Sequence, residues 1–174
     1  MANKFVYFLT GASGVGKTTL VDLLEQKYKA REDIAFLRFD SIGVPSVEEQ
    51  IRNYSSPSEW QRATTKIWIS KILHEVEKPI VIFEGQVNFD FIYEAFRAEK
   101  FSDFSAILID CDEEEMERRL KDERNQAELA NQNMRNWRKY LRQQAENLGV
   151  PIINTTRKNK ESVFEEFVKI FEKT

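Results

Sequence analysis

The stretch Gly11-Ala12-Ser13-Gly14-Val15-Gly16-Lys17-Thr18 decides the fold, because it matches the pattern G-x-x-x-x-G-K-[ST] at every fixed position. Glycines allow the backbone to turn tightly, so that successive N–H groups approach phosphate oxygens. The apolar run Phe5–Leu9 precedes the stretch, and an amphipathic helix from Lys17 to about Lys29 is expected after it. The N-terminal end of that helix is positive and faces the same anion. Strand, loop and helix together predict a phosphate-binding loop.

This loop is the predicted site for a nucleoside triphosphate with Mg²⁺. Lys17 supplies a point charge to the β and γ phosphates, and the Thr18 hydroxyl is a ligand for the metal. A chance match in a chain of this length is expected on the order of once in a hundred. The predicted nucleotide-binding residues of the loop are Gly11, Ala12, Ser13, Gly14, Val15, Gly16, Lys17, Thr18 and Thr19.

Length and composition indicate one domain spanning 1–174. The formal net charge of −3 argues against nucleic acid as a general partner. Cys111 is the only cysteine, so no intrachain disulfide can form. The sequence holds no long apolar segment that predicts a membrane span, and the start of the chain does not resemble a signal peptide. We therefore expect a cytoplasmic protein that does not associate with membranes.

Apolar runs recur along the chain with helical stretches between them. Most are apolar at successive positions, which is typical of strands buried on both faces of a parallel sheet. The alternation of strands and helices predicts an α/β fold. The expected strands are Phe5–Leu9, Ala35–Phe39, Ile80–Phe83, Ala106–Ile109 and Ile152–Ile153.

Several helix boundaries can be predicted from capping residues. Ser46-x-x-Glu49 and Ser58-x-x-Gln61 both match the capping box, and Asp112 is expected to cap a helix after the fourth strand. Gly149 is expected to end the helix that precedes the fifth strand.

Two insertions interrupt the regular alternation. Residues 41–78 place two helices between the second and third strands, and residues 112–148 place a long charged segment between the fourth and fifth. In an enzyme that transfers phosphoryl groups, such insertions suit an acceptor site and a mobile lid.

The N-terminal phosphate-binding loop, the two helical insertions and the arginine-rich lid resemble the nucleoside monophosphate kinase-like group of P-loop kinases. Adenylate, shikimate and gluconate kinases belong to this group. The resemblance implies a three-layer P-loop NTPase fold, with a parallel five-stranded sheet ordered 2-3-1-4-5, helices on both faces and a helical lid. It also implies ATP and Mg²⁺ as cofactors. GTPases fit less well because their Asn-Lys-x-Asp segment is missing, and AAA+ machines because the chain has no room for their extra helical domain.

Acidic residues at predicted strand ends are candidates for the metal and the acceptor. Glu84 ends the third strand and is expected to hold Mg²⁺ through water or to orient the acceptor hydroxyl. Its alternative role is to anchor a loop. Asp40 follows the second strand and can take a proton from an acceptor hydroxyl, or it can be a turn residue bonded to its own backbone. Asn88 stands about where the resemblance implies an arginine for an acceptor phosphate, which weakens the case for a monophosphate acceptor. Asp110 is a second candidate for Mg²⁺.

The predicted lid contains Arg118, Arg119, Arg124, Arg135, Arg138 and Arg142. The resemblance implies that Arg119 stacks on adenine and that Arg124 reaches the phosphates. The last three share one helical stripe, so the helix can offer guanidinium groups to the active site. We expect one or two of the six to be catalytic, with Arg124 and Arg142 favoured, although a charge run is often a solvated surface. Arg157, after the fifth strand, is a further candidate for the adenine site.

The sequence thus predicts an ATP-dependent kinase with Lys17, Asp40, Glu84, Arg124 and Arg142 as catalytic residues and Thr18 and Glu84 at the metal. The expected partners are a nucleoside triphosphate and a small metabolite, nucleoside or nucleotide that the sequence does not identify, in an oligomeric state that stays open. Two alternatives remain at this point: a binding module gated by nucleotide, and a kinase that acts on nucleic-acid ends.

Overall fold

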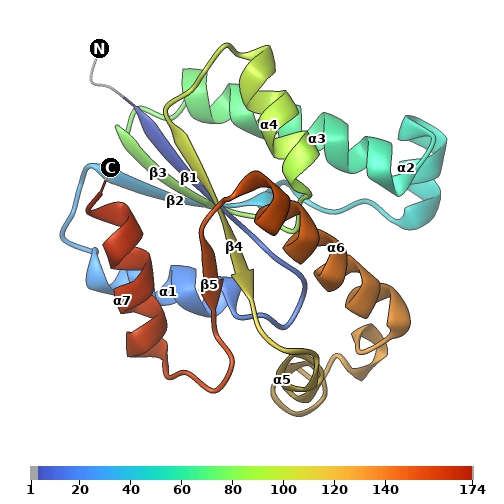
Figure 1. Cartoon of the computed structure of the whole chain (residues 1–174). Helices are drawn as coiled ribbons and strands as arrows, with labels where there is room; N and C mark the ends of the chain where they lie inside the picture. Colours follow the sequence, from blue (N-terminus) through green and yellow to red (C-terminus); the bar gives the residue numbers. More distant parts are fainter. Residues whose placement is uncertain (1–3, 174) are drawn as a thin grey trace.

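The computed structural model describes residues 4–173, which form one parallel sheet with helices on both faces (Figure 1). The strand order is β2-β3-β1-β4-β5, as expected, and β1 pairs with β3 on one side and β4 on the other. The strands are β1 (Phe5–Thr10), β2 (Ile34–Arg38), β3 (Ile80–Glu84), β4 (Phe104–Asp110) and β5 (Ile152–Asn154). The helices are α1 (Lys17–Lys27), α2 (Val47–Tyr54), α3 (Pro57–His74), α4 (Phe89–Ala98), α5 (Glu113–Arg118), α6 (Gln132–Leu148) and α7 (Lys160–Phe171). Short 3₁₀ turns lie at Phe39–Ile42 and Ala127–Leu129, and a π-helical turn, Arg119–Glu123, continues α5.

Alternate residues of the strands feed different hydrophobic clusters on the two faces of the sheet. On one face Val6, Phe8 and Phe83 pack against α3, α4 and α6. On the other, Leu9 and Ile107 pack against α1, α5 and α7. Both faces of each central strand are therefore covered, which explains why the strands are apolar at successive positions.

The structure confirms most helix boundaries and corrects one. Ser46 forms the complete capping box with Glu49, Asp112 caps α5, and Gly149 ends α6 with a left-handed backbone. The second capping box is wrong: Ser56, not Ser58, caps α3 and accepts a hydrogen bond from the backbone N–H of Glu59. Pro57 takes the first helical position, where its missing N–H costs nothing.

The carboxyl ends of all five strands meet at one edge of the sheet because the strands of the described chain are parallel. This edge brings together Arg38 from β2, Glu84 from β3, Asp110 from β4 and the phosphate-binding loop that follows β1. In open α/β sheets ligands bind outside this edge. The fold thus places the phosphate-binding loop beside charged residues at the ends of three other strands.

Helix α6 packs on the sheet through Leu141 and Ala145, which are buried in the core on that face. Leu148, the last residue of the helix, is 49% exposed. Within residues 4–173 no helix combines the length and the apolar character that a membrane span needs.

Candidate functional site

The phosphate-binding loop owes its shape to glycines that no other residue could replace without strain. Gly16 has a φ of 100° and precedes the first turn of α1. A side chain on Gly11 would bring its Cβ to 2.3 Å from the carbonyl oxygen of Ile109, at the adjacent end of β4. The loop is therefore pressed against the sheet edge, and its amides stay fixed around the N-terminus of α1.

Lys17 starts α1 and turns back over the loop. Its Nζ donates to the carbonyl oxygens of Gly11 and Ala12, each at 2.8 Å. Burial lowers the pKa of Lys17 to about 8, and the negative charges of Glu84 and Asp40 partly oppose this shift. The ammonium thus lies in a partly desolvated position where a polyphosphate would be its best counter-charge.

Glu84 and Thr18 meet beside Lys17. Thr18 Oγ1 donates to Glu84 Oε2 at 3.3 Å, and the second carboxylate oxygen lies 3.4 Å from Arg38 Nε. Glu84 is only 6% exposed, and burial raises its pKa, while the charges of Lys17 and Arg38 act in the opposite direction. Adjacent hydroxyl and carboxylate oxygens are the hard ligands that Mg²⁺ takes beside phosphate oxygens, so these two residues fit the expected metal.

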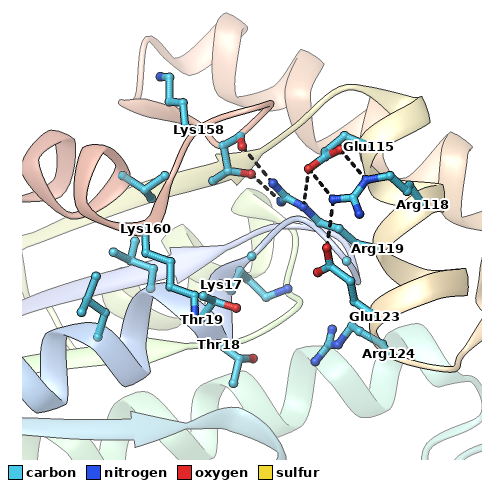
Figure 2. A pocket seen from close by; sticks show the side chains of 16 residues that line it. Lys17, Thr18, Thr19, Glu115, Arg118, Arg119, Glu123, Arg124, Lys158 and Lys160 are labelled. Carbon is cyan, nitrogen blue, oxygen red and sulfur yellow. Dashed lines mark hydrogen bonds and ion pairs between the residues drawn. The ribbon is translucent and has the colours of Figure 1, made fainter.

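A cavity of about 430 Å³ opens over the loop and the start of α1 (Figure 2). Lys158 and Lys160 lie on one side of it and the arginines of α5 and the π-helical turn on the other, with Lys17 between them. The cavity is lined by Gly14, Gly16, Lys17, Thr18, Thr19, Leu20, Leu23, Glu115, Arg118, Arg119, Glu123, Arg124, Thr155, Lys158, Lys160 and Val163. This lining combines phosphate donors with apolar side chains and has the size of a nucleotide site.

Arg119 joins three parts of this wall. Its Nη1 donates to the carbonyl oxygen of Val15 and to Thr155 Oγ1, at 3.2 and 2.8 Å, and its Nη2 donates to the Thr155 carbonyl oxygen at 2.9 Å. Nε bonds to Glu115 at 2.9 Å. The guanidinium therefore ties the phosphate-binding loop to the segment after β5, and its contact with adenine stays a prediction.

Arg118 and Arg124 differ in their partners. Arg118 is held by the carboxylates of Glu115 and Glu123, at 3.0 and 2.9 Å. Arg124 also lines the cavity, its charge acts on Lys17, and within residues 4–173 its guanidinium has no carboxylate partner. Arg124 therefore lies in the cavity lining without a carboxylate partner in the described chain, and its role at the phosphates stays a prediction.

Two arginines of α6, Arg138 and Arg142, form ion pairs with the buried Asp110. Asp110 is 1% exposed, and its carboxylate accepts hydrogen bonds from Arg138 Nη1 at 3.2 Å and Arg142 Nη1 at 2.9 Å. Arg142 also pairs with Glu146 and lies outside the cavity lining. Asp110 is thus an ion-pair centre that fastens α6 to the sheet, not a free ligand for Mg²⁺. This pairing removes the geometric basis for Arg142 as a catalytic residue.

The remaining candidates lie around the sheet edge. Asp40 is exposed in the 3₁₀ turn after β2, close enough for its charge to act on Lys17. Arg157 is exposed in a left-handed turn, with a φ of 52°, and does not line the cavity. Lys158 and Lys160 line the cavity in its place. Asn88 caps α4, where its side chain accepts a hydrogen bond from the N–H of Phe91.

Sequence reasoning missed several residues of the site. Thr155, Lys158 and Lys160 lie after β5, close to Arg157 in the sequence, and nothing in their spacing distinguishes them from Arg157. Arg38 was read as a strand residue, although its position directly before Asp40 could have marked it as a neighbour of the strand-end acids. Glu115, in the first turn of α5, has no distinguishing signal in the sequence, yet its carboxylate accepts hydrogen bonds from both Arg118 and Arg119.

Comparisons with known proteins agree with this geometry. Residues 8–138 match the family model AAA_18, described as an AAA domain. Shikimate kinase from Acinetobacter baumannii, solved in complex with shikimate, superposes with a TM-score of 0.65 at 15% identity, over 99% of this chain and 95% of that one. A gluconokinase from Sinorhizobium meliloti 1021 gives 0.65 at 10% identity, over 99% and 97%. Thymidylate kinase from Ehrlichia chaffeensis gives 0.55 at 17% identity, over 97% and 99%.

No curated protein matches the chain by sequence. The structural likenesses, all at low identity, show a shared fold. The matching family is described as an AAA domain, and the matched residues 8–138 include the phosphate-binding loop. The structural neighbours named above are kinases of small molecules. The chain belongs to the AAA_18 family of P-loop domains and has the fold of the nucleoside monophosphate kinase-like group.

Proposed function

We propose that this protein is an ATP-dependent kinase that transfers the γ-phosphoryl group to a hydroxyl of a small molecule. The observation that carries the proposal is the contact between Thr18 Oγ1 and Glu84 Oε2, directly beside Lys17 and at the mouth of the cavity. This arrangement supplies a metal position, a phosphate-binding ammonium and a nucleotide-sized space together. Such positioning and electrostatic stabilisation are what phosphoryl transfer requires.

The residues have separate roles in this proposal. The amides of the phosphate-binding loop and Lys17 hold the β and γ phosphates, and Thr18 and Glu84 hold Mg²⁺. The metal, when bound, neutralises charge on the phosphates and keeps them oriented. Arg119 offers its planar face to the base. Arg124 lies over the transferred group and stabilises its charge.

Asp40 completes the reaction on the acceptor side. The acceptor oxygen forms a bond to the γ-phosphorus as the bond from that phosphorus to the bridging β,γ-oxygen breaks, and ADP leaves with that electron pair. The hydroxyl proton passes to the Asp40 carboxylate, which is exposed at the same sheet edge. Asp40 is thus the proposed base, and Glu84 is kept for the metal because it is buried against Thr18 and Arg38.

The structural neighbours favour a kinase of a small molecule without naming the acceptor. These neighbours are a shikimate kinase, a gluconokinase and a thymidylate kinase. These acceptors differ in shape, so the shared fold alone selects none of them for this chain.

Calorimetry with ATP and Mg²⁺, followed by transfer assays with nucleosides, sugars and small acids, tests the proposal. Wild-type protein should bind the nucleotide and release ADP only when an acceptor is present. Lys17→Ala should lower ATP affinity on the order of 100-fold, because it removes a charge-assisted contact to two phosphates. Lys27→Ala is the matched control, since Lys27 pairs with Glu161 on the surface. Unchanged affinity in Lys17→Ala, or tight ATP binding with no accepted substrate, would contradict a kinase.

A further inference from the structure

The acceptor side of the sheet edge is neutral to acidic, and this limits the substrate. Its residues are Ser13 from the phosphate-binding loop, Asp40, Trp60 and Gln61 from the first turns of α3, and Gln86 after β3. We refer to these five residues as the Gln86 cluster. Resting on the proposed kinase function, we infer that the acceptor carries no phosphate or carboxylate group and offers a hydroxyl to Asp40 and a ring face to Trp60.

Gln86 is held from two sides by neutral groups. Ser13 Oγ donates to Gln86 Oε1 at 2.8 Å, and Gln61 Nε2 donates to the Gln86 carbonyl oxygen at 2.8 Å. Within residues 4–173 no protein group accepts a hydrogen bond from Gln86 Nε2. The fixed amide therefore presents its N–H groups beside the phosphate-binding loop, where they suit the hydroxyl or carbonyl oxygens of an uncharged molecule.

Trp60 directly precedes Gln61, the residue that donates to the Gln86 carbonyl oxygen. Its ring meets Phe39 edge to face, with centroids 5.9 Å apart and an interplanar angle of 87°. Phe39 packs closely against Gly85, because a Cβ added to Gly85 would lie 2.8 Å from the Cβ of Phe39. Trp60 remains half buried and packs against Phe39, the residue directly before the exposed Asp40. A partly exposed indole ring in the same part of the sheet edge as a carboxylate suits a sugar or nucleoside ring that carries a hydroxyl.

Three cations of the insertion 41–78, Arg52, Arg62 and Lys66, lie near carboxylates. Arg62 Nε lies 2.8 Å from Glu94, and Lys66 Nζ lies 2.7 Å from the other oxygen of the same carboxylate. Arg52 is exposed and lies 3.9 Å from Glu49. Among the other cations of 41–100, His74 lies 2.9 Å from Glu99, Lys78 donates to the Glu32 carbonyl oxygen, and Lys71 Nζ lies 6.0 Å from the centre of the Trp68 ring. Arg97 and Lys100 lie at and just beyond the C-terminal end of α4, the end away from the segment that follows β3.

The neighbouring elements supply no spare cation to the cluster either. Arg138 and Arg142 of α6 are paired with the buried Asp110, and Arg38 is paired with Asp22, Glu25 and Glu84. Lys17 and Arg124 face the cavity that holds the donor phosphates.

Within the part of the chain that the structure describes, Asp40 forms no ion pair, so an anionic acceptor would meet its carboxylate with no arginine paired to it. Phosphate and carboxylate groups are recognised in proteins chiefly by charge-assisted donors, and bringing an anion to a carboxylate without one is unfavourable. The inference separates this chain from its structural neighbours, because shikimate, gluconate and thymidylate are all anions.

A transfer assay with matched pairs of acceptors tests the inference. The pairs are each common nucleoside with its monophosphate, glucose with gluconate, and shikimate methyl ester with shikimate, each with radiolabelled ATP and Mg²⁺. Label should enter a neutral member at least about 100-fold faster than its anionic partner, since an uncompensated charge pair costs a few kcal/mol. Transfer to anionic members alone would overturn the inference while leaving the kinase function intact. Transfer to no member would instead count against the kinase function, and the binding measurement then decides the inference.

Binding is followed by tryptophan emission of the full-length protein loaded with Mg²⁺ and a non-hydrolysable ATP analogue. Neutral members of the pairs should change the emission of wild-type protein and not that of Trp60→Leu, whose nucleotide affinity stays at the wild-type value. A response to the anionic members only, or a response that persists in Trp60→Leu, overturns the inference.

A variant that adds charge provides the reverse test. Gln61→Arg keeps an N–H donor for the Gln86 carbonyl oxygen and places a cation in the cluster. In this variant the ratio of the transfer rate to the neutral member over that to the anionic member should fall by about 10-fold. The change should appear in the KM of the acceptor, and the KM of ATP should stay the same. Gln26→Arg adds the same charge at an exposed position on α1 and should leave the preference unchanged. An unchanged preference in Gln61→Arg contradicts the placement of the acceptor at this cluster.

Discussion

Thr18 Oγ1 lies 3.3 Å from Glu84 Oε2, so the first turn of α1 and the end of β3 share one hydrogen bond at the carboxyl edge of the sheet. The two residues are far apart in the chain, and the parallel pairing of β1 with β3 brings them together. Each prediction below depends on this edge or on the helices around it.

Glu84→Gln should lower kcat by roughly 100-fold and raise the Mg²⁺ concentration needed for half-maximal rate, since an amide is a poor metal ligand. Titration of the rate with Mg²⁺ at saturating ATP measures both effects. Glu25→Gln removes another carboxylate partner of Arg38 without touching Thr18, and its Mg²⁺ dependence should match wild type. A Glu84→Gln enzyme with normal Mg²⁺ dependence would remove Glu84 from the metal site.

ATP affinity should fall as pH rises through about 8. Burial lowers the pKa of Lys17 to about 8 in the free protein, so the ammonium is charged below that pH and becomes neutral above it. Polyphosphate binds the charged form, so above pH 8 binding must take up a proton and the apparent Kd rises by up to about tenfold per pH unit.

Calorimetry between pH 7.5 and 9.5, in buffers of different ionisation enthalpy, reports this proton uptake directly. Lys17→Arg should bind more weakly but with a flat profile over the same range, because arginine stays charged. A flat profile in wild type would show that Lys17 is not the titrating group.

Arg124→Gln should reduce kcat on the order of 100-fold or more while leaving protein stability unchanged, because the side chain is exposed and has no carboxylate partner in the described chain. Arg135→Gln is the matched control, since Arg135 pairs with Glu117 and lies outside the cavity. Steady-state rates together with melting curves separate the two effects. Equal losses of kcat in both variants would mean that the positive charge of the lid acts as a whole and that Arg124 has no specific role.

Asp110→Asn should destabilise the fold by about 3 kcal/mol, because Arg138 and Arg142 would lose a buried counter-charge. Urea unfolding measures the change. Glu146→Gln removes only the exposed partner of Arg142 and should cost less than about 1 kcal/mol. If Arg142→Met lowers kcat with stability intact, Arg142 is catalytic after all and its pairing with Asp110 is secondary.

The parts of the fold that local sequence determines could be predicted. The phosphate-binding loop, the strands and the caps at Ser46, Asp112 and Gly149 depend on residues within a few positions of one another. The strand order was implied by the family resemblance. The sequence pattern alone does not give it, because no local feature specifies which strands pair. Ser58 failed as a cap because Ser56 competes for the same role and Pro57 favours the earlier start.

The candidate site could be predicted only in part, because the choice of ionic partner depends on the packed structure. The sequence around Arg124 and Arg142 is rich in both acidic and basic residues and does not distinguish the two arginines. In the structure Arg142 forms an ion pair with the buried Asp110, whereas Arg124 has no carboxylate partner in the described chain. Arg157 and Lys158 are neighbours, and a left-handed turn at Arg157 decides which of them lines the cavity.

The bonds from Arg119 to Val15 and Thr155 have a consequence for how the protein matures. One wall of the cavity is closed by residues that follow β5, the fifth strand of the described sheet. A nascent chain halted on the ribosome before residue 155 contains β1, β3 and the loop between β1 and α1, but not this wall. The complete cavity is therefore available only after the segment that follows β5 has been synthesised.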